Sequence, residues 1–183
     1  MPARPVNIVL HYASEADMLA VCEVERYMER ILGKPPEEFG VKVDRRCASA
    51  HKTPDYICNV LNDSDADVRG VILGRQAAAP PAIDANCIEP VVTYLTDGKD
   101  NPAKVYGSLD VPSGVSCMTV SPHGPEHMAL ALLKIAAIKE NRLNIPIHDY
   151  QIKKRQDVLE TDARYKGLST TEAENIAKVR LKK

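Results

Sequence analysis

Short β-branched-rich runs alternate along the chain with stretches in which apolar residues recur at helical spacing. Five runs have the length and the flanking breakers of buried strands: Val6–Leu10, Gly40–Arg46, Val68–Leu73, Glu89–Leu95 and Val115–Val120. Helical spacing, Pro and capping residues predict the helices that follow them, over residues 17–32, 53–61, 80–86, 103–108 and 127–139. Regular strand–helix alternation of this kind indicates a parallel sheet that helices cover on both faces.

Five such units predict an α/β fold, a three-layer, doubly wound parallel sheet of the flavodoxin-like kind. The order of the strands in that sheet does not follow from the pattern. After about residue 146 the composition shifts to charged residues with sparse apolar ones. We therefore expect a catalytic domain over residues 1–145 and a charged helical tail over residues 146–183, which packs on neighbouring subunits or stays partly mobile.

Ligands of doubly wound sheets bind beyond the carboxyl ends of the strands. The segments His11–Asp17, Ala48–Lys52, Gly74–Ala79 and Pro112–Gly114 follow predicted strands or precede predicted helices. We expect these four segments to converge on one site, with His11 close to it in the first strand-end loop.

His51 is the sharpest candidate for chemistry, because it stands at a strand-to-helix junction between Ser49 and Lys52. Main-chain N–H groups and a lysine at such a junction suit a phosphate. The alternative is a capping or structural histidine. Ser14 and Asp17 likewise offer a hydroxyl and a carboxylate at a helix start, for phosphate and ribose or for simple capping.

Gly74 would let the backbone approach a ligand closely, and Arg75 beside it is either a phosphate clamp or a structural ion pair. The glycine spacing matches neither a dinucleotide fingerprint nor a P-loop. Ser113 and Gly114 form a second small-residue segment, or only a turn. His123 and His127 have metal-ligand spacing, but nearby prolines and the lack of an acidic third ligand disfavour a metal site.

Composition narrows the class of protein further. The 183 residues carry a formal net charge of −1, with no Trp and one Phe, which argues against nucleic-acid and anionic-membrane partners. Five cysteines, an odd number without a C-x-x-C pair, argue against a disulfide framework or a structural zinc. No signal-peptide core and no run near ~20 apolar residues is evident, so we expect a cytoplasmic protein.

The block Ser49-Ala50-His51-Lys52-Thr53-Pro54-Asp55 resembles the Ser-Ala-His-Lys/Arg signature of the aminoimidazole ribonucleotide carboxylase and N5-carboxyaminoimidazole ribonucleotide mutase family. The Lys form, with Gly74-Arg75, Ser108-Leu109 and Pro112-Ser113-Gly114, is more similar to the CO2-using carboxylases. The mutase branch carries a Gly-rich, His-Leu-Pro loop at the Gly74 position. The similarity covers residues 5–137.

The resemblance implies a carboxy-lyase of de novo purine biosynthesis that adds CO2 to C4 of aminoimidazole ribonucleotide, without metal or organic cofactor. It implies that His51 moves the C4 proton and that Ser49 orients His51 or the ligand. The implied substrate-binding residues are Ser14, Asp17, Ser49, Ala50, Lys52, Gly74, Arg75, Ser113 and Gly114. It also implies a homo-octamer with active sites between subunits.

The chain departs from the family pattern around this site, and the departures fall at Ala13, Glu15, Ala16, Gln76, Ala77 and Asp110. Glu15 adds negative charge near the expected phosphate, and Asp110 replaces a cation of the family pattern with an anion near the inferred pocket. Two alternatives therefore stand beside the carboxylase. One is a related lyase or carboxylase that acts on a less anionic substrate, and the other is a non-catalytic oligomeric binding protein.

Overall fold

Strand β1, Val6–Tyr12, lies inside a five-stranded parallel sheet. The computed structural model describes residues 4–55, 57, 61, 65–74 and 78–180 of the chain. The strand order is β2-β1-β3-β4-β5, and every neighbouring pair is parallel. The other strands are β2 (Val41–Cys47), β3 (Val68–Leu73), β4 (Val91–Leu95) and β5 (Met118–Thr119). This is the flavodoxin-like doubly wound order, so the predicted fold class is confirmed.

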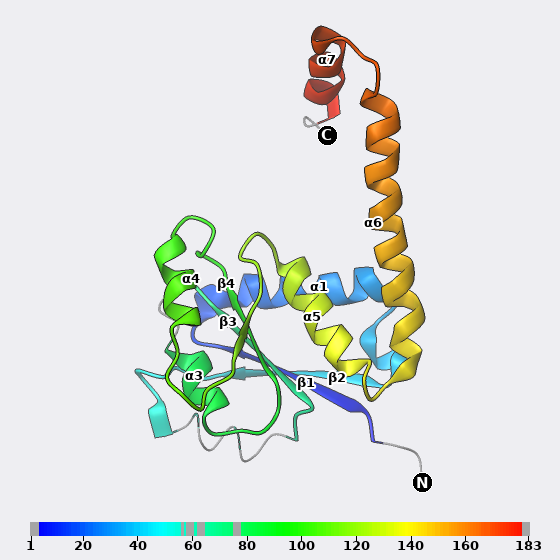
Figure 1. The fold of residues 1–183 in the computed structure, drawn as a ribbon. Helices are drawn as coiled ribbons and strands as arrows, with labels where there is room; N and C mark the ends of the chain where they lie inside the picture. Colours follow the sequence, from blue (N-terminus) through cyan, green and yellow to red (C-terminus); the bar gives the residue numbers. More distant parts are fainter. Residues whose placement is uncertain (1–3, 56, 58–60, 62–64, 75–77, 181–183) are drawn as a thin grey trace. The chain divides into compact units, whose positions relative to one another are not determined.

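One face of the sheet is covered by α1 (Met18–Leu32) and α5 (Pro125–Ala136), which pack against each other (Figure 1). α1 follows a 3-10 turn over Glu15–Asp17 and ends at Gly33, whose φ of 72° gives the left-handed C-cap. α5 packs closely over Gly70 of β3. A Cβ placed on Gly70 would lie 2.7 Å from the Met128 side chain, so the helix requires glycine there.

The opposite face is covered by α3 (Ala79–Asp84) and by the helical residues Ile57 and Leu61. Ile57 and Leu61 share one apolar cluster with Ile83 and with inward-facing residues of β3 and β4. α4 (Pro102–Leu109) contacts β5 at the sheet edge. Buried strands between two helical layers explain why the strands read as nearly continuous apolar runs.

Strand β5 is shorter than the sequence predicts, because only Met118 and Thr119 of the expected run pair with β4. The main-chain N–H groups of Val115 and Ser116, which precede β5, form hydrogen bonds outside the sheet. The Val115 N–H donates to the Pro112 carbonyl at 3.3 Å, and the Ser116 N–H donates to Asp84 Oδ2 at 2.6 Å. These bonds keep the segment out of the ladder.

His11 lies inside β1 rather than in a strand-end loop, and its side chain is 2% exposed. Its Nε2 lies 3.4 Å from Arg69 Nη1, and Arg69 Nη2 donates to Glu89 at 3.0 Å. Burial, together with the charges of Arg69 and Arg46, lowers the pKa of His11 to about 3. His11 is therefore a neutral core residue, which corrects the expected position.

At the amino end of the sheet, the buried carboxylate of Asp67 joins three segments of the chain. It accepts hydrogen bonds from Arg4 at 2.9 and 3.0 Å, from Lys139 at 2.5 Å and from the Asn7 N–H at 2.8 Å. Burial raises the pKa of this carboxyl, but the bonds from Lys139, Asn7 and Arg4 outweigh it and leave the pKa below its usual value.

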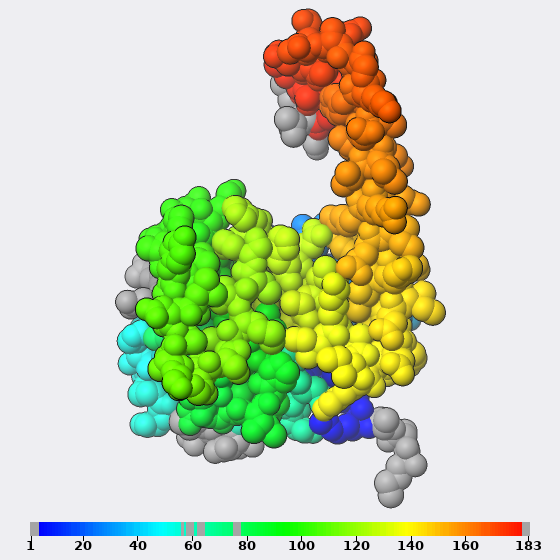
Figure 2. Space-filling view, viewed as in Figure 1, coloured from blue at the N-terminus to red at the C-terminus, as the bar shows by residue number. Residues whose placement is uncertain are grey.

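The chain divides into a first unit, residues 1–147, and a second unit, residues 148–183. In Figure 2 the segments from α3 to α5, coloured green to yellow, cover much of the face of the first unit that is turned toward the viewer. A 3-10 turn, Asn141–Leu143, leads into α6 (Asn144–Tyr165), and α7 (Thr170–Arg180) follows. Among the described residues, none of the helices combines the length and apolar character that crossing a bilayer demands.

Candidate functional site

The exit of β1 is organised by the carboxylate of Asp17, which is 7% exposed. Its Oδ2 accepts from the Ser14 N–H at 3.0 Å, from Ser14 Oγ at 3.0 Å and from the Ala13 N–H at 3.3 Å. The carboxylate therefore occupies the main-chain N–H groups of Ala13 and Ser14. These are contacts of the capping alternative.

The same carboxylate joins β1 to the exit of β3. Asp17 Oδ1 accepts from the Gly74 N–H at 2.9 Å. A Cβ on Gly74 would lie 3.2 Å from Asp17 Oδ1 and 3.3 Å from Thr96 Oγ1, so any larger residue would crowd the two neighbouring strand ends. The glycine thus allows three strand exits to come close together.

Lys104 and Asp97 extend this contact to β4, and sequence reasoning did not find them. Lys104 lies in the first turn of α4, and its Nζ donates to the Gly74 carbonyl at 3.1 Å and to Asp97 Oδ2 at 3.0 Å. Neither residue belongs to a recognisable motif. The only signal is that Asp97 comes directly after a predicted strand and Lys104 lies at the start of the next predicted helix, where polar side chains of a doubly wound sheet gather.

The exit of β2 is a short turn that is stabilised by hydrogen bonds between its own residues. The Ser49 N–H donates to Thr53 Oγ1 at 2.9 Å, Thr53 Oγ1 donates to the Ser49 carbonyl at 3.2 Å, and the Thr53 N–H donates to the same carbonyl at 2.8 Å. His51 and Lys52 lie inside this turn with exposed side chains. Thr53 stands at the predicted N-cap position, because helix begins at Pro54 and the Thr53 carbonyl accepts from the Ile57 N–H at 3.2 Å. Its hydroxyl also closes the turn that carries His51.

The two strand exits are adjacent, because the Ala48 N–H donates to the Tyr12 carbonyl at 2.9 Å. Ser49, Ala50, His51 and Lys52 therefore follow directly from the point where β2 meets β1. With Ser14, Asp17 and Gly74 they line the carboxyl edge of the sheet. Arg75, also predicted to bind substrate, lies outside the described residues.

Ser113 and Gly114 do not join this group within one chain. They precede β5 and therefore lie toward the amino ends of the strands, where Ser116 bonds to Asp84 at the end of α3. Both are exposed, and Gly114 has φ of 91°. The expected convergence of four segments is thus wrong for a single chain, because the predicted strand after Pro112 begins rather than ends at this point.

The residues that depart from the family pattern are mostly on the surface. Glu15 and Ala16 are exposed beside the half-buried Ala13, and Asp110 is exposed at the C-cap of α4. Gln76 and Ala77 lie outside the described residues. The added negative charges of Glu15 and Asp110 are therefore in contact with solvent.

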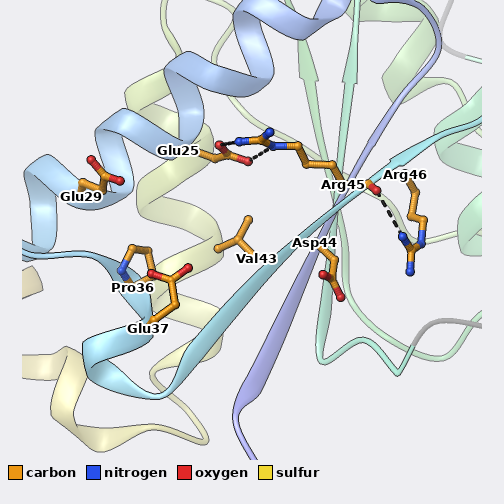
Figure 3. Close-up of a pocket in the computed structure, with 8 residues that line it drawn as sticks. All are labelled: Glu25, Glu29, Pro36, Glu37, Val43, Asp44, Arg45 and Arg46. Carbon is orange, nitrogen blue, oxygen red and sulfur yellow. Dashed lines mark hydrogen bonds and ion pairs between the residues drawn. The ribbon is translucent and has the colours of Figure 1, made fainter.

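A charged pocket of about 440 Å³ lies between α1 and β2 (Figure 3). Arg45 forms a bidentate ion pair with Glu25 across it. The pocket is lined by Glu25, Glu29, Pro36, Glu37, Val43, Asp44, Arg45 and Arg46. Within the described ranges, no three His, Cys, Asp or Glu side chains gather as a cluster that could hold a metal ion.

Comparison with known proteins places this geometry in a family. The chain is 30% identical over 133 residues to N5-carboxyaminoimidazole ribonucleotide mutase of Methanocaldococcus jannaschii, which covers 72% of this chain and 85% of that protein. It is 31% identical over 139 residues to phosphoribosylaminoimidazole carboxylase of Archaeoglobus fulgidus, with 74% of this chain and 76% of that protein covered.

The fold agrees with a solved structure of that kind. The crystal structure of Treponema denticola PurE superposes with a TM-score of 0.73 at 22% identity, over 87% of this chain and 98% of that one. The sequence of residues 7–157 matches the family described as AIR carboxylase. The chain therefore belongs to the AIR carboxylase family of purine biosynthesis, the family that the Ser49–Asp55 block predicted.

Proposed function

We propose that this enzyme carboxylates aminoimidazole ribonucleotide at C4 with CO2 and releases 4-carboxyaminoimidazole ribonucleotide. The 5-amino group makes C4 an enamine-like nucleophile. C4 attacks the carbon of CO2, the new C–C bond forms, and one C=O electron pair moves onto oxygen. Loss of the C4 proton then restores the aromatic ring, and the reverse sequence releases CO2.

His51 is the proposed carrier of the C4 proton, and its placement is the observation on which the proposal rests. The side chain is exposed at the carboxyl edge, on a turn braced by three hydrogen bonds between Ser49 and Thr53. A proton carrier must reach the substrate and must be held in one orientation. Exposure supplies the first condition and the braced turn the second.

The remaining predicted residues are proposed to bind the ribonucleotide. Lys52 supplies a cation beside His51, and Ser49 and Ala50 supply the backbone of the braced turn. The small residue Gly74 admits the ligand to the strand ends. The proposed set also includes Ser14, Asp17, Arg75, Ser113 and Gly114.

A neighbouring subunit is proposed to bring Ser113 and Gly114 to the site, since their own chain places them elsewhere. The tail has apolar side chains available for such an assembly. Val158 is 68%, Leu159 58% and Val179 63% exposed, and among the described residues of α7 none is buried. Helices of this kind gain most of their stability from packing, so we propose that residues 146–183 pack on neighbouring subunits.

CO2 addition, rather than transfer from an N5-carboxylated substrate, is supported by the Lys form of the Ser-Ala-His-Lys block. It is also supported by the phosphoribosylaminoimidazole carboxylase of Treponema denticola, which aligns over 89% of this chain and 99% of its own length at 26% identity. Relatives named as mutases align as well, so the two reactions must be separated by experiment.

The separating assay offers 4-carboxyaminoimidazole ribonucleotide to the protein and follows ultraviolet absorbance and released CO2. A carboxylase forms aminoimidazole ribonucleotide and CO2. We expect His51→Asn to lose activity by at least about a hundredfold, the usual contribution of general acid–base catalysis. His148→Asn, at an exposed histidine of α6, serves as the matched control and retains activity. Conversion of N5-carboxyaminoimidazole ribonucleotide without CO2 release would instead identify a mutase.

A less anionic substrate is a second candidate, because Asp17 already occupies the donors of Ala13 and Ser14 before α1. A phosphate that bound the donors of Ala13 and Ser14 would have to displace the carboxylate that already accepts three hydrogen bonds from them. Thermal stabilisation by aminoimidazole ribonucleotide but not by its dephosphorylated nucleoside would argue against this candidate. Equal stabilisation by both would support it.

A further inference from the structure

We infer that Lys104 is a positioning residue of the active site, which acts by holding the Gly74 peptide in place at the exit of β3. This inference rests on the proposed function. Lys104 lies outside every motif by which the family was recognised. It belongs to α4, whose first turn lies at the carboxyl edge because β4 ends seven residues earlier, at Leu95.

The lysine joins two strand exits through a single nitrogen. Nζ donates to the main-chain carbonyl of Gly74, which follows β3, at 3.1 Å, and to Asp97 Oδ2, which follows β4, at 3.0 Å. The side chain of Lys104 is 24% exposed, whereas that of Asp97 is 53% exposed. The lysine is thus the more enclosed member of the pair, and its bond to the carbonyl lies on the inner side.

Gly74 is held from its other side as well. Its N–H donates to the buried carboxylate of Asp17 at 2.9 Å. One charged side chain from the start of α1 and one from the start of α4 therefore hold the amide and the carbonyl of the same residue. Glycine has the widest backbone freedom of any residue, so these two charged partners determine where its backbone lies.

This arrangement differs from the ion pairs on the outside of the protein. Lys178 and Glu174 also approach to 3.1 Å, but they are 69% and 60% exposed, and the lysine bonds to a side chain within its own helix. Such a pair contributes little to the fold or to a site. Lys104 instead connects segments 30 residues apart, directly beside residues that are proposed to bind substrate.

The consequence is a specific kinetic signature. If Lys104 sets the position of the Gly74 backbone, its loss weakens substrate binding and leaves the proton transfer at His51 intact. We expect Lys104→Met to raise KM for 4-carboxyaminoimidazole ribonucleotide about tenfold, with kcat changed by less than about twofold. Lys104→Arg, which keeps the charge and the donors, should restore KM to within about threefold of wild type.

Two further variants sharpen the test. Asp97→Asn leaves the bond from Lys104 to the Gly74 carbonyl in place, so KM should change by less than about threefold. Lys178→Met removes an exposed ion pair of the same length and should change neither KM nor kcat. Hydrogen exchange by mass spectrometry gives a readout that needs no substrate. The peptide that contains Gly74 should exchange about tenfold faster in Lys104→Met than in wild type.

The outcomes separate this inference from the proposed function. Wild type that neither binds nor converts the ribonucleotide overturns the proposed function, and the inference about its site with it. Active wild type with an unchanged KM in Lys104→Met overturns the inference alone. A fall in kcat at constant KM, or unchanged exchange at Gly74, also overturns it. A raised KM that Lys104→Arg restores, with faster exchange in Lys104→Met, supports it.

Discussion

Substitution of His11 by Gln should remove a large part of the protein's sensitivity to mild acid. His11 is buried in β1, and its pKa is lowered from 6.5 to about 3 by burial and by the charges of Arg69 and Arg46. The folded state therefore keeps the imidazole neutral at a pH at which the unfolded chain binds a proton. Gln is neutral at every pH and can still present an acceptor to Arg69.

The sign follows from proton binding in the two states. Above pH 6.5 neither state binds the proton, and His11 has no effect on the pH dependence. Between pH 6.5 and about 3 only the unfolded state binds it, so the free energy of unfolding falls by about 1.4 kcal/mol per pH unit. At pH 5 the loss is about 2 kcal/mol, and this figure is the same for any folded pKa below 4.

Urea unfolding at pH 7.5 and pH 5.0, at one protein concentration, measures this difference. We expect the free energy of unfolding of wild type to drop by about 2 kcal/mol more than that of His11→Gln. His148→Gln, an exposed histidine of α6, should behave as wild type. Equal drops in wild type and His11→Gln would refute the reasoning. The pKa of Glu89 is also lowered, but from an ordinary value of 4.5. Its effect on the free energy of unfolding therefore falls mainly below pH 4.5, outside the interval from pH 7.5 to pH 5.0.

Two further substitutions test other contacts. Asp67→Asn removes a buried charge that two cations and a main-chain amide share, and urea unfolding should show a loss of about 2 kcal/mol. Asp65→Asn, at a carboxylate 76% exposed, should cost less than about 0.5 kcal/mol; equal losses would contradict the assignment. Thr53→Val removes the hydroxyl that closes the His51 turn, so the decarboxylation assay should show kcat reduced about tenfold. Thr161→Val, which loses one hydroxyl bond within α6, should leave kcat unchanged, and a similar kcat in both variants would count against a role for the turn.

The elements that local pattern determines were predicted well. β3 has the predicted bounds, Val68–Leu73, and the helix that ends at Leu32 stops at the predicted glycine. Both elements have continuous apolar spacing and a breaker residue at the end, so the local sequence determines their bounds with little influence from tertiary contacts. The strand order could not be predicted, because it depends on which buried faces meet.

The errors arose where contacts between distant residues decide the outcome. β5 has only two of its six expected residues, and the segment before it is kept out of the ladder because Asp84, more than 30 positions away, accepts the Ser116 N–H. His11 was expected in a loop, but Arg69 in the neighbouring strand accommodates it inside the sheet. Lys104 was missed because its role depends on the distance to the Gly74 carbonyl, which no local pattern encodes.

Strand β2 forms one edge of the sheet, and its outward side chains bear on how the protein resists aggregation. Lys42 pairs with Asp44 at 2.7 Å, and Arg45 pairs with Glu25 of α1. A second copy that added a strand along this edge would have to strip water from these charges and would meet its own like charges in register. Charged edges of this kind suppress strand addition between molecules. Fibril growth from the folded protein should therefore not start at β2.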